Sequence, residues 1–272
     1  MRIAVIGLGL IGGSLAKAAI RAGHSVAGVD PHTPDEPWCS PECRPELLAD
    51  ADVVIVALPP AAVVPWIDGH AGQFRQGSVV VDVAGVKARI CQELERHAFQ
   101  HRWTFVGGHP MAGKEVSGFA NATPDLFRGA SMILTPYPSC GRGPLDLLES
   151  LFMSLGFGRM VVTTPEHHDR MIALTSQLAH VVSSAYVQDP LAAEHSGYSA
   201  GSFHDMTRVA QLDPDVWSDL FLANGPALLD ALDGLIARLG EYRRAIASGD
   251  GASLRALLAA GRAARLATIT SR

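Results

Sequence analysis

Apolar and polar residues follow two different patterns along the chain, and the change falls near Thr164. Before this residue, short runs of β-branched residues alternate with segments whose apolar residues recur at helical spacing, which predicts strands alternating with helices. The predicted strands are 2–7, 24–30, 53–58, 78–83, 104–106, 131–134 and 161–164, and the clearest helices between them are 11–22, 87–98 and 144–155. This order is typical of a doubly wound, mostly parallel α/β sheet.

The helical pattern continues without strands after Thr164. Pro165 and Glu166 open a long helix, and 226–246 and 252–268 are rich in Leu and Ala. We therefore predict a Rossmann domain over residues 1–164 and an all-α domain over residues 165–272. One segment of the first domain departs from the pattern, because five prolines between positions 31 and 45 predict an irregular crossover without a regular helix.

Composition and charge narrow the class of protein. The chain has 272 residues, of which 48% are hydrophobic, and a net charge of −5. Its start leads into glycines without a small-residue cleavage site, and the uncharged stretch 171–188 contains Thr, Gln, His and Ser, as in a buried helix rather than a membrane span. Lys and Arg are scattered without a basic cluster. We expect a soluble, cytoplasmic protein with no membrane or nucleic-acid partner.

The cysteines give no metal-site pattern. Cys39 and Cys43 form a C-x3-C pair with His32 nearby, but no second pair follows. Zinc sites built from cysteines need further ligands at defined spacing. We therefore predict free thiols and no metal.

The strongest short motif is a glycine fingerprint at the end of the first predicted strand. Gly7, Gly9 and Gly12 follow the spacing G-x-G-x-x-G and open the next helix, and Asp30 ends the second predicted strand. In this context the glycines allow a tight turn, close approach of a pyrophosphate and close packing of helix on strand, while the carboxylate accepts hydrogen bonds from ribose hydroxyls. Asp30 repels a 2′-phosphate and no Arg follows it, so we predict NAD as the cofactor in preference to NADP or FAD. The predicted cofactor-binding residues are Gly7, Leu8, Gly9, Leu10, Ile11, Gly12, Asp30, Leu58 and Pro59.

Three groups of polar residues are candidates for the chemistry. The first is 107–113, Gly-Gly-His-Pro-Met-Ala-Gly, which follows a predicted strand and so places His109 at the carboxyl edge of the sheet, where ligands bind in this fold. Glycines on both sides suit a backbone that lies close to a ligand. A catalytic role for His109 is therefore favoured over a purely structural one.

The second group surrounds His180 on the long helix. A helical wheel places Ser176, Gln177, Ser183 and Ser184 beside it, opposite an apolar face. This polar stripe carries no Lys or Glu, unlike most solvent-exposed faces. It is consistent either with the lining of a cleft or with a buried helix whose hydroxyl groups are hydrogen-bonded.

The third group is the segment 201–208, Gly-Ser-Phe-His-Asp-Met-Thr-Arg, which Trp217 follows. A guanidinium group binds a carboxylate through two parallel hydrogen bonds, which an ammonium group does not. Arg208 is therefore suited to a substrate carboxylate. The residues alone are equally consistent with a surface ion pair between Arg208 and Asp205 or Asp213.

The order of motifs resembles that of the prephenate/arogenate dehydrogenase family over nearly the whole chain. The segments are GLGLIGGSL, DVAGVK, GGHPMAG-x-E-x-SG, PE-x-HD before the long helix, and SFHDMTR with a later Trp. The resemblance implies oxidative decarboxylation of a cyclohexadienyl carboxylate, in which a hydride leaves ring C4 for NAD, carbon dioxide leaves C1 and a phenol results. It also implies a homodimer formed through the helical domain. Because this chain ends near Arg272 and carries no chorismate mutase helices, we expect neither an ACT-type regulatory domain nor a chorismate mutase domain.

The resemblance further implies the roles of individual residues. His109 matches the catalytic histidine that accepts the proton of the 4-hydroxyl group, and Arg208 matches the arginine that binds a substrate carboxylate. His180 matches a second histidine of the substrate site. The implied substrate-binding residues are Gly85, His109, His180, Gly201, His204 and Arg208, and Glu115 and Asp205 match a carboxylate pair at the site entrance.

Three positions depart from the family pattern on the substrate side, where Gly85 replaces a serine, Gln177 a histidine and His204 a basic residue. They leave prephenate as the first substrate to consider, with arogenate, both compounds or an amino-substituted prephenate as alternatives. A β-hydroxyacid or imine reductase is a second interpretation, although GGHPMAG has no place in those families. A third is a non-catalytic NAD-sensing module, which needs neither His109 nor Arg208.

Overall fold

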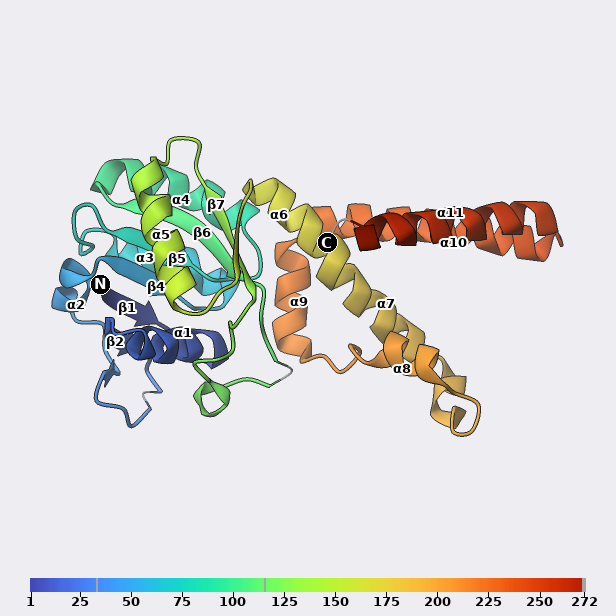
Figure 1. The fold of residues 1–272 in the computed structure, drawn as a ribbon, viewed down its shortest axis with the longest axis horizontal. Coiled ribbons are helices and arrows are strands. Elements are labelled where there is room, and N and C mark those ends of the chain that lie inside the picture. Colours follow the sequence, from blue (N-terminus) through green and yellow to red (C-terminus); the bar gives the residue numbers. More distant parts are fainter. Residues whose placement is uncertain (33, 115, 271–272) are drawn as a thin grey trace. The chain divides into compact units, whose positions relative to one another are not determined.

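Within the residues that the structure describes, 1–32, 34–114 and 116–270, the first part of the chain forms one eight-stranded sheet (Figure 1). The structure is a computed structural model, and its strands are β1 (Arg2–Ile6), β2 (Ser25–Val29), β3 (Cys39–Ser40), β4 (Val53–Val56), β5 (Val79–Asp82), β6 (Thr104–Pro110), β7 (Ser131–Pro136) and β8 (Arg159–Val162). Their order across the sheet is β3-β2-β1-β4-β5-β6-β7-β8, and neighbours are parallel except for β6 and β7. The predicted doubly wound, mostly parallel sheet is therefore confirmed.

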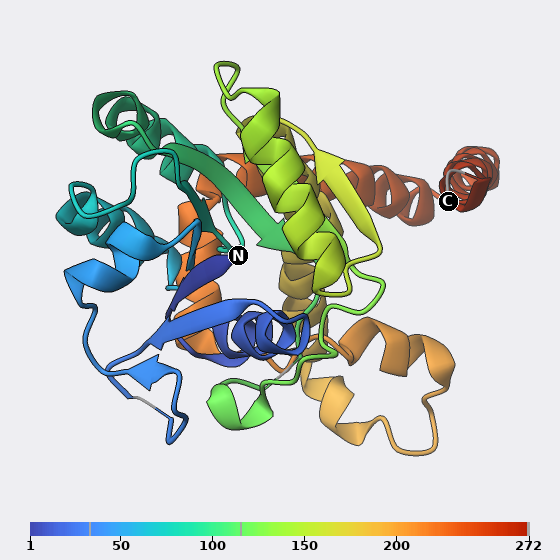
Figure 2. The ribbon, with the colours of Figure 1, turned by 60° about the vertical axis from the view of Figure 1, so that its left-hand side comes forward.

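Helices cover both faces of this sheet (Figure 2). They are α1 (Leu10–Arg21) and α5 (Arg142–Ser154) on one face, and α2 (Pro45–Asp50), α3 (Pro60–His70) and α4 (Ala88–His101) on the other. Successive strand residues point to opposite faces, so Val5 of β1 joins the cluster under α1 and α5 while Ile6 joins the cluster on the other side. Burial on both faces explains why the central strands read as continuous apolar runs.

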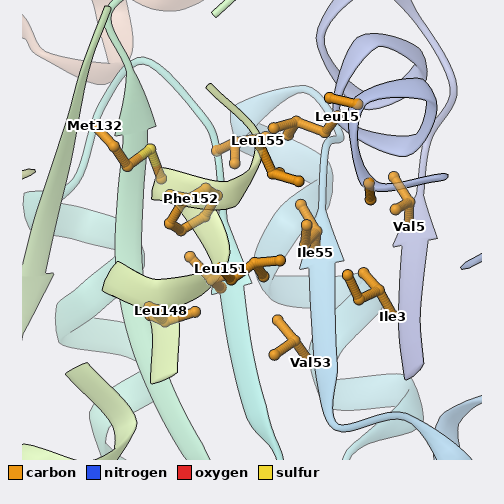
Figure 3. Close-up of a cluster of buried hydrophobic side chains, with 14 of the residues drawn as sticks. Ile3, Val5, Leu15, Val53, Ile55, Met132, Leu148, Leu151, Phe152 and Leu155 are labelled. Carbon is orange, nitrogen blue, oxygen red and sulfur yellow. The ribbon is translucent and has the colours of Figure 1, made fainter. Parts of the chain in front are cut away.

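The apolar cluster under α1 and α5 packs these two helices against the strands of the sheet (Figure 3). Strands β1 and β4 contribute Ile3, Val5, Val53 and Ile55, and the helices contribute Leu15, Leu148, Leu151 and Phe152, each at most 2% exposed. Removing such aliphatic and aromatic side chains from water is the main favourable term in folding, at roughly 25 cal/mol per Å² of apolar surface. The carboxyl ends of β1 and β4 are therefore held rigidly relative to α1.

The proline-rich segment after β2 is more regular than predicted. Cys39–Ser40 forms the edge strand β3 beside β2, and α2 begins at Pro45. Proline is compatible with the first helical position because its missing N–H group has no partner there. The expectation of a crossover without a regular helix is therefore wrong at residues 45–50, where the last proline starts a helix.

Helices follow β8 up to residue 224, within a compact unit that spans residues 1–224. They are α6 (Pro165–Ile172), a π-helical turn (Ala173–Gln177), α7 (Leu178–Val187), a 3-10 turn (Pro190–Glu194), α8 (Gly201–Thr207) and α9 (Pro214–Ala223). Thr164 caps α6, because its hydroxyl oxygen accepts a hydrogen bond from the backbone N–H of His167 at 3.2 Å. The predicted change from α/β to helical structure is confirmed.

The π-helical turn displaces the faces that a regular helical wheel predicts. It places one extra residue in a turn and so rotates the residues after it relative to those before it. Gln177 and Ser183, expected opposite the apolar face, are each 2% exposed, whereas Leu174, expected on the apolar face, is 55% exposed. The predicted single polar face is therefore wrong, and His180 is half-buried within a mixed surface.

A second compact unit begins at Gly225. It consists of α10 (Gly225–Ala247) and α11 (Gly251–Thr270), which pack against each other. Its exposed large apolar residues are Leu229, Ile236, Leu239, Ile246, Leu258, Leu266 and Ile269. No single helix among the described residues is long and apolar enough to cross a membrane, although α9 and α10 taken together meet the length and composition for one.

A buried ion pair lies at the carboxyl end of β5, beside β6. The carboxylate of Asp82 accepts hydrogen bonds from the Lys87 ammonium group, from the backbone N–H of Ala84 at 3.1 Å and from that of Gly108 at 3.2 Å. The Asp82 and Lys87 side chains are completely buried. Burial raises the pKa of Asp82, and the Lys87 ammonium group opposes that rise. The pair therefore ties the turn between β5 and α4 to β6 at the residue before His109.

We predict that Lys87→Ala destabilises the protein by about 3–5 kcal/mol, because it leaves the Asp82 carboxylate buried without its cation. Arg89→Ala is a matched control at the start of the same helix, since Arg89 pairs with Glu93 at 2.7 Å on the surface and exposed pairs contribute little. Chemical denaturation followed by circular dichroism measures both free energies of unfolding. Equal losses in the two variants would contradict the stabilising role of the buried pair.

Candidate active site

The glycine fingerprint forms the turn between β1 and α1. Gly7 has a φ of +85°, and a Cβ there would lie 2.4 Å from the carbonyl oxygen of Ala57. A Cβ at Gly12 would lie 1.9 Å from the carbonyl oxygen of Gly7. Around Gly9, by contrast, no described heavy atom apart from its chain neighbours lies within 4 Å of such a Cβ. Packing therefore requires Gly7 and Gly12, while Gly9 leaves open space at the N-terminus of α1, where a pyrophosphate fits.

Asp30 follows β2 directly, and its carboxylate is held in place. One oxygen accepts a hydrogen bond from the backbone N–H of Leu8 at 2.7 Å, and the other from that of His32 at 2.8 Å. Because Leu8 belongs to the fingerprint turn, the carboxylate fixes a negative charge beside that turn. Such a charge suits the hydroxyl groups of a ribose and repels a phosphate on it.

The remaining predicted cofactor-binding residues lie at the same edge of the sheet. Leu10 and Ile11 begin α1, and Leu58 and Pro59 follow β4, which pairs with β1. Leu58 also packs close to the turn, since its Cδ2 atom would lie 3.1 Å from a Cβ at Gly7. The structure thus gathers the whole predicted set at the carboxyl ends of β1, β2 and β4.

His109 lies within β6, which extends four residues beyond the strand predicted from the sequence and pairs His109 with Ile133 of β7. Its Nδ1 atom is 2.9 Å from Nε2 of His168 on α6, and Nδ1 of His168 is 2.7 Å from the carboxylate of Asp169. Both partners are buried. Sequence reasoning assigned neither of them a role, although the PE-x-HD segment that contains them was part of the resemblance.

The surroundings of His109 favour its neutral form. Desolvation lowers its pKa well below the usual 6.5, and the positive charge of Lys87 acts in the same direction. A neutral imidazole has one nitrogen that can accept a proton, as a general base requires. His109 therefore stays competent as a base at a lower pH than an ordinary histidine.

Gly85 lies against the ring of His109. A Cβ at Gly85 would be 3.9 Å from Nε2 of His109 and 3.3 Å from a methyl carbon of Leu220 on α9. Nε2 is the ring nitrogen that is not bonded to His168. The glycine therefore leaves this nitrogen without the side chain that the family pattern would place beside it.

A cavity of about 480 Å³ is formed by the loop after β6 together with α7, α9 and the segment between α8 and α9. Its lining includes His180, Arg208, Trp217 and Ser117. The rings of His180 and Trp217 have centroids 4.0 Å apart at an interplanar angle of 31°, and Nδ1 of His180 donates a hydrogen bond to the carbonyl oxygen of Ser176 at 2.8 Å. These two contacts fix the orientation of the imidazole ring at the cavity.

Arg208 is exposed at this cavity. Within the described part of the chain it forms no ion pair, with Asp205, Asp213 or any other acid. Asp213 instead caps α9 by accepting hydrogen bonds from the backbone N–H groups of Asp215 and Val216. The guanidinium group therefore has its hydrogen-bonding capacity available for a ligand.

Other residues that the resemblance placed at the site lie elsewhere. Gly201, His204 and Asp205 are exposed on α8, outside the cavity lining. Glu115 lies outside the described residues. His109 and Gly85 form their own group and do not line this cavity.

Gln177, one of the three departures from the family pattern, forms side-chain hydrogen bonds to the C-terminal end of α9. Its side-chain amide nitrogen donates to the carbonyl oxygen of Leu220 at 3.1 Å, and its amide oxygen accepts from the side chain of Asn224 at 2.7 Å. The side chain of Asn224 also donates to the backbone carbonyl of Asp169 at 2.9 Å. Gln177 therefore fastens the C-terminal end of α9 to α6 and the π-helical turn.

A Rossmann sheet with this fingerprint turn, a fixed acidic residue after β2 and a neutral histidine on β6 defines a dinucleotide-dependent dehydrogenase. Residues 39–165 match the family model described as prephenate dehydrogenase, nucleotide-binding domain, and residues 164–260 match that described as prephenate dehydrogenase, dimerization domain. The cyclohexadienyl dehydrogenase of Zymomonas mobilis is 31% identical over 98% of this chain and 96% of its own length. The chain belongs to the prephenate dehydrogenase family, and the predicted enzyme class, an NAD-dependent oxidoreductase, is confirmed.

Solved structures of the family share the whole fold. Synechocystis arogenate dehydrogenase superposes with a TM-score of 0.83 at 27% identity, covering 97% of this chain and 99% of its own. Prephenate dehydrogenase from Aquifex aeolicus in complex with hydroxyphenyl propionate and NAD+ gives 0.78 at 26% identity, with 98% and 97% covered. The names of these relatives refer to different substrates, so members share a fold and differ in what they oxidise.

We predict that alanine at two fingerprint glycines separates cofactor binding from folding. Gly12→Ala should cost about 1–3 kcal/mol of stability, because its Cβ overlaps the carbonyl oxygen of Gly7. Gly9→Ala should leave the melting temperature unchanged and weaken NAD binding roughly tenfold or more, because its methyl group occupies the open space at α1. Thermal unfolding and calorimetric titration with NAD measure the two effects. Wild-type NAD affinity in Gly9→Ala would refute the assignment of that space to the cofactor.

Proposed function

We propose that this protein catalyses the NAD-dependent oxidative decarboxylation of prephenate to 4-hydroxyphenylpyruvate, a step of tyrosine biosynthesis. The observation that carries the proposal is His109, a neutral, half-buried histidine on β6 whose Nδ1 is already bonded to His168. Oxidation of an alcohol needs a base for the hydroxyl proton and an acceptor for the hydride. NAD bound at the fingerprint turn supplies the acceptor.

The proposed reaction balances with these groups. The proton of the 4-hydroxyl group passes to Nε2 of His109 while a hydride leaves ring C4 with its electron pair. The bond between C1 and its carboxylate then breaks, carbon dioxide departs, and the electron pair of that bond completes the aromatic ring. The oxygen on C4 then takes back the proton from His109, so that a phenol results and His109 is neutral again.

Arg208 and His180 are the proposed substrate-binding residues at the cavity. The exposed guanidinium group of Arg208 is suited to a carboxylate, through two parallel hydrogen bonds. His180 donates through Nδ1 to Ser176, so its Nε2 atom remains for a polar group of the substrate. The roles of Gly201 and His204 as further contacts, and of Glu115 and Asp205 as an entrance pair, are proposed from the family resemblance.

Asp30 supports NAD over NADP as the cofactor. Its carboxylate is locked between Leu8 and His32 and cannot swing away from the turn without breaking two hydrogen bonds. A 2′-phosphate would bring a second negative charge to the same place. The preference for NAD over NADP therefore follows from the fixed negative charge of Asp30.

Two positions on the substrate side bear on which compound is oxidised. Gly85 removes a hydroxyl group from the neighbourhood of His109, and the exposed His204 stands where the family pattern has a basic residue. Arogenate, both compounds, or an amino-substituted prephenate of secondary metabolism are the alternatives.

We also propose a cytoplasmic homodimer and a domain boundary at Thr164. The two matching family models meet at residues 164 and 165, and the second describes a dimerization domain. None of the described side chains of α11 is buried, and large apolar residues are exposed along both α10 and α11. Two helices with this much exposed apolar surface need a partner, and a second copy of the chain supplies a matching one.

Turnover with purified compounds tests the proposed function. Prephenate and arogenate are each supplied with NAD or NADP, and formation of reduced cofactor is followed by absorbance. We expect the highest kcat/KM for prephenate with NAD. Turnover of arogenate alone would make arogenate the substrate. A preference for NADP would contradict the role of Asp30. NAD binding without turnover of either compound would favour a sensing module.

His109→Asn and Arg208→Ala are predicted to fail in different ways. Loss of the base should lower kcat by roughly 10²–10⁴-fold with NAD binding unchanged. Loss of the guanidinium group should mainly raise KM, by the equivalent of about 1.5–3 kcal/mol. Steady-state kinetics with varied substrate separates the two. Unchanged kcat in His109→Asn would remove His109 from the mechanism, and unchanged KM in Arg208→Ala would place the carboxylate elsewhere.

A further inference from the structure

His109 is the first of three side chains joined in a line. The Nδ1 atom of His109 is 2.9 Å from Nε2 of His168, and Nδ1 of His168 is 2.7 Å from the Oδ1 atom of Asp169. His168 is 1% exposed and Asp169 is 5% exposed, so water does not compete for these hydrogen bonds. The line therefore has defined donors and acceptors.

Asp169 sets the direction of the hydrogen bonds. A carboxylate only accepts, so Nδ1 of His168 must carry a proton and donate it. Asp169 also accepts from the backbone N–H groups of Lys87 and Ala88, each at 2.8 Å, at the start of α4. Two such donors and the positive end of a helix already compensate the carboxylate charge, so His168 needs no second proton.

A neutral His168 with its proton on Nδ1 can only accept through Nε2. The hydrogen bond between the two histidines then runs from Nδ1–H of His109 to Nε2 of His168. This leaves Nε2 of His109 unprotonated, and that is the atom 3.9 Å from the position of a Cβ at Gly85.

We infer that His168 and Asp169 are positioning residues, which hold His109 in the tautomer whose Nε2 atom accepts the substrate proton. The inference rests on the proposed function for its role in turnover, while the tautomer itself is a property of the folded protein. When His109 has accepted a proton, its Nδ1–H group still donates to His168, so the ring keeps its orientation. The carboxylate of Asp169, at the other end of the line, carries the charge opposite to that of the protonated His109. Lys87 and Asp82 are the other charged groups at this place, and they remain paired with each other.

The arrangement explains why the PE-x-HD segment at the start of the long helix matters for the site. Thr164 starts α6, which puts His168 and Asp169 on the buried side of its first turns. Asn224 donates to the backbone carbonyl of Asp169 at 2.9 Å and so fixes its position from α9. His109 on β6 is thereby oriented by α6, which follows the last strand, β8, in the chain.

Nitrogen-15 NMR of histidine in the intact wild-type protein tests the tautomer without reference to turnover. His109→Asn identifies the resonances of His109 by their loss. We expect neutral His109 to carry its proton on Nδ1, which gives Nδ1 and Nε2 clearly different chemical shifts. A proton on Nε2 would overturn the inference whether or not the protein oxidises prephenate.

Three substitutions on α6 test the effect on catalysis. His168→Leu removes the acceptor from His109 and should lower kcat roughly 10²-fold with little change in KM, while His109 shifts toward the Nε2–H tautomer. His168→Gln keeps a carbonyl oxygen that can accept from Nδ1–H of His109 and should restore part of kcat. His167→Gln, at the exposed neighbouring residue, is the matched control and should leave both constants unchanged.

Folding and cofactor binding are monitored in each variant by thermal unfolding and by NAD titration. A His168→Leu protein that binds NAD normally and keeps wild-type kcat would overturn the positioning role. If His168→Leu fails to fold, the comparison of His168→Gln with wild type decides, since loss of the Nδ1–H tautomer in that variant without loss of kcat would also overturn it. Absence of any turnover in wild-type protein would refute the proposed function and leave the NMR result to stand by itself.

Discussion

The buried ion pair of Asp82 and Lys87 is the constraint on which the site depends. Asp82 holds the backbone of Gly108, which precedes the base, and Lys87 begins the turn into α4. The backbone N–H groups of Lys87 and Ala88 donate hydrogen bonds to the carboxylate of Asp169. A continuous set of hydrogen bonds therefore runs from the sheet interior through the start of α4 to His168 and His109. Its charged members are buried, so each is held by the others rather than by water.

Most of the fold could be predicted because its signals are local. Apolar runs of four to six residues buried on both faces identify the central strands, and Pro165 with Thr164 before it marks the start of the helical part. The parts that were missed depend on partners. β6 continues through 107–110, where glycine and proline argue against a strand, because antiparallel pairing with β7 supplies hydrogen bonds there. α2 was missed because a proline that starts a helix looks the same in sequence as one that ends it.

The site divides in the same way. The fingerprint glycines and Asp30 lie within 24 residues in one β-α-β unit, so their spacing alone predicts their meeting. His168 is 59 residues from His109, and neither periodicity nor spacing indicates that α6 returns to β6. The π-helical turn has no sequence signal of its own, and it moved Gln177 from the expected polar stripe into a buried contact with α9. Residue type therefore pointed to His109, and only the tertiary structure shows what holds it.

The exposed apolar faces of α10 and α11 bear on what stability means for this protein. If a second copy covers them, separating the two copies brings a large apolar surface into contact with water at the same moment that the helices lose their neighbour. The folded fraction then depends on protein concentration as well as on temperature, and dilution acts as a denaturant. A melting temperature would then hold for one protein concentration only, and the folded fraction at a given temperature would be higher in a concentrated solution than in a dilute one.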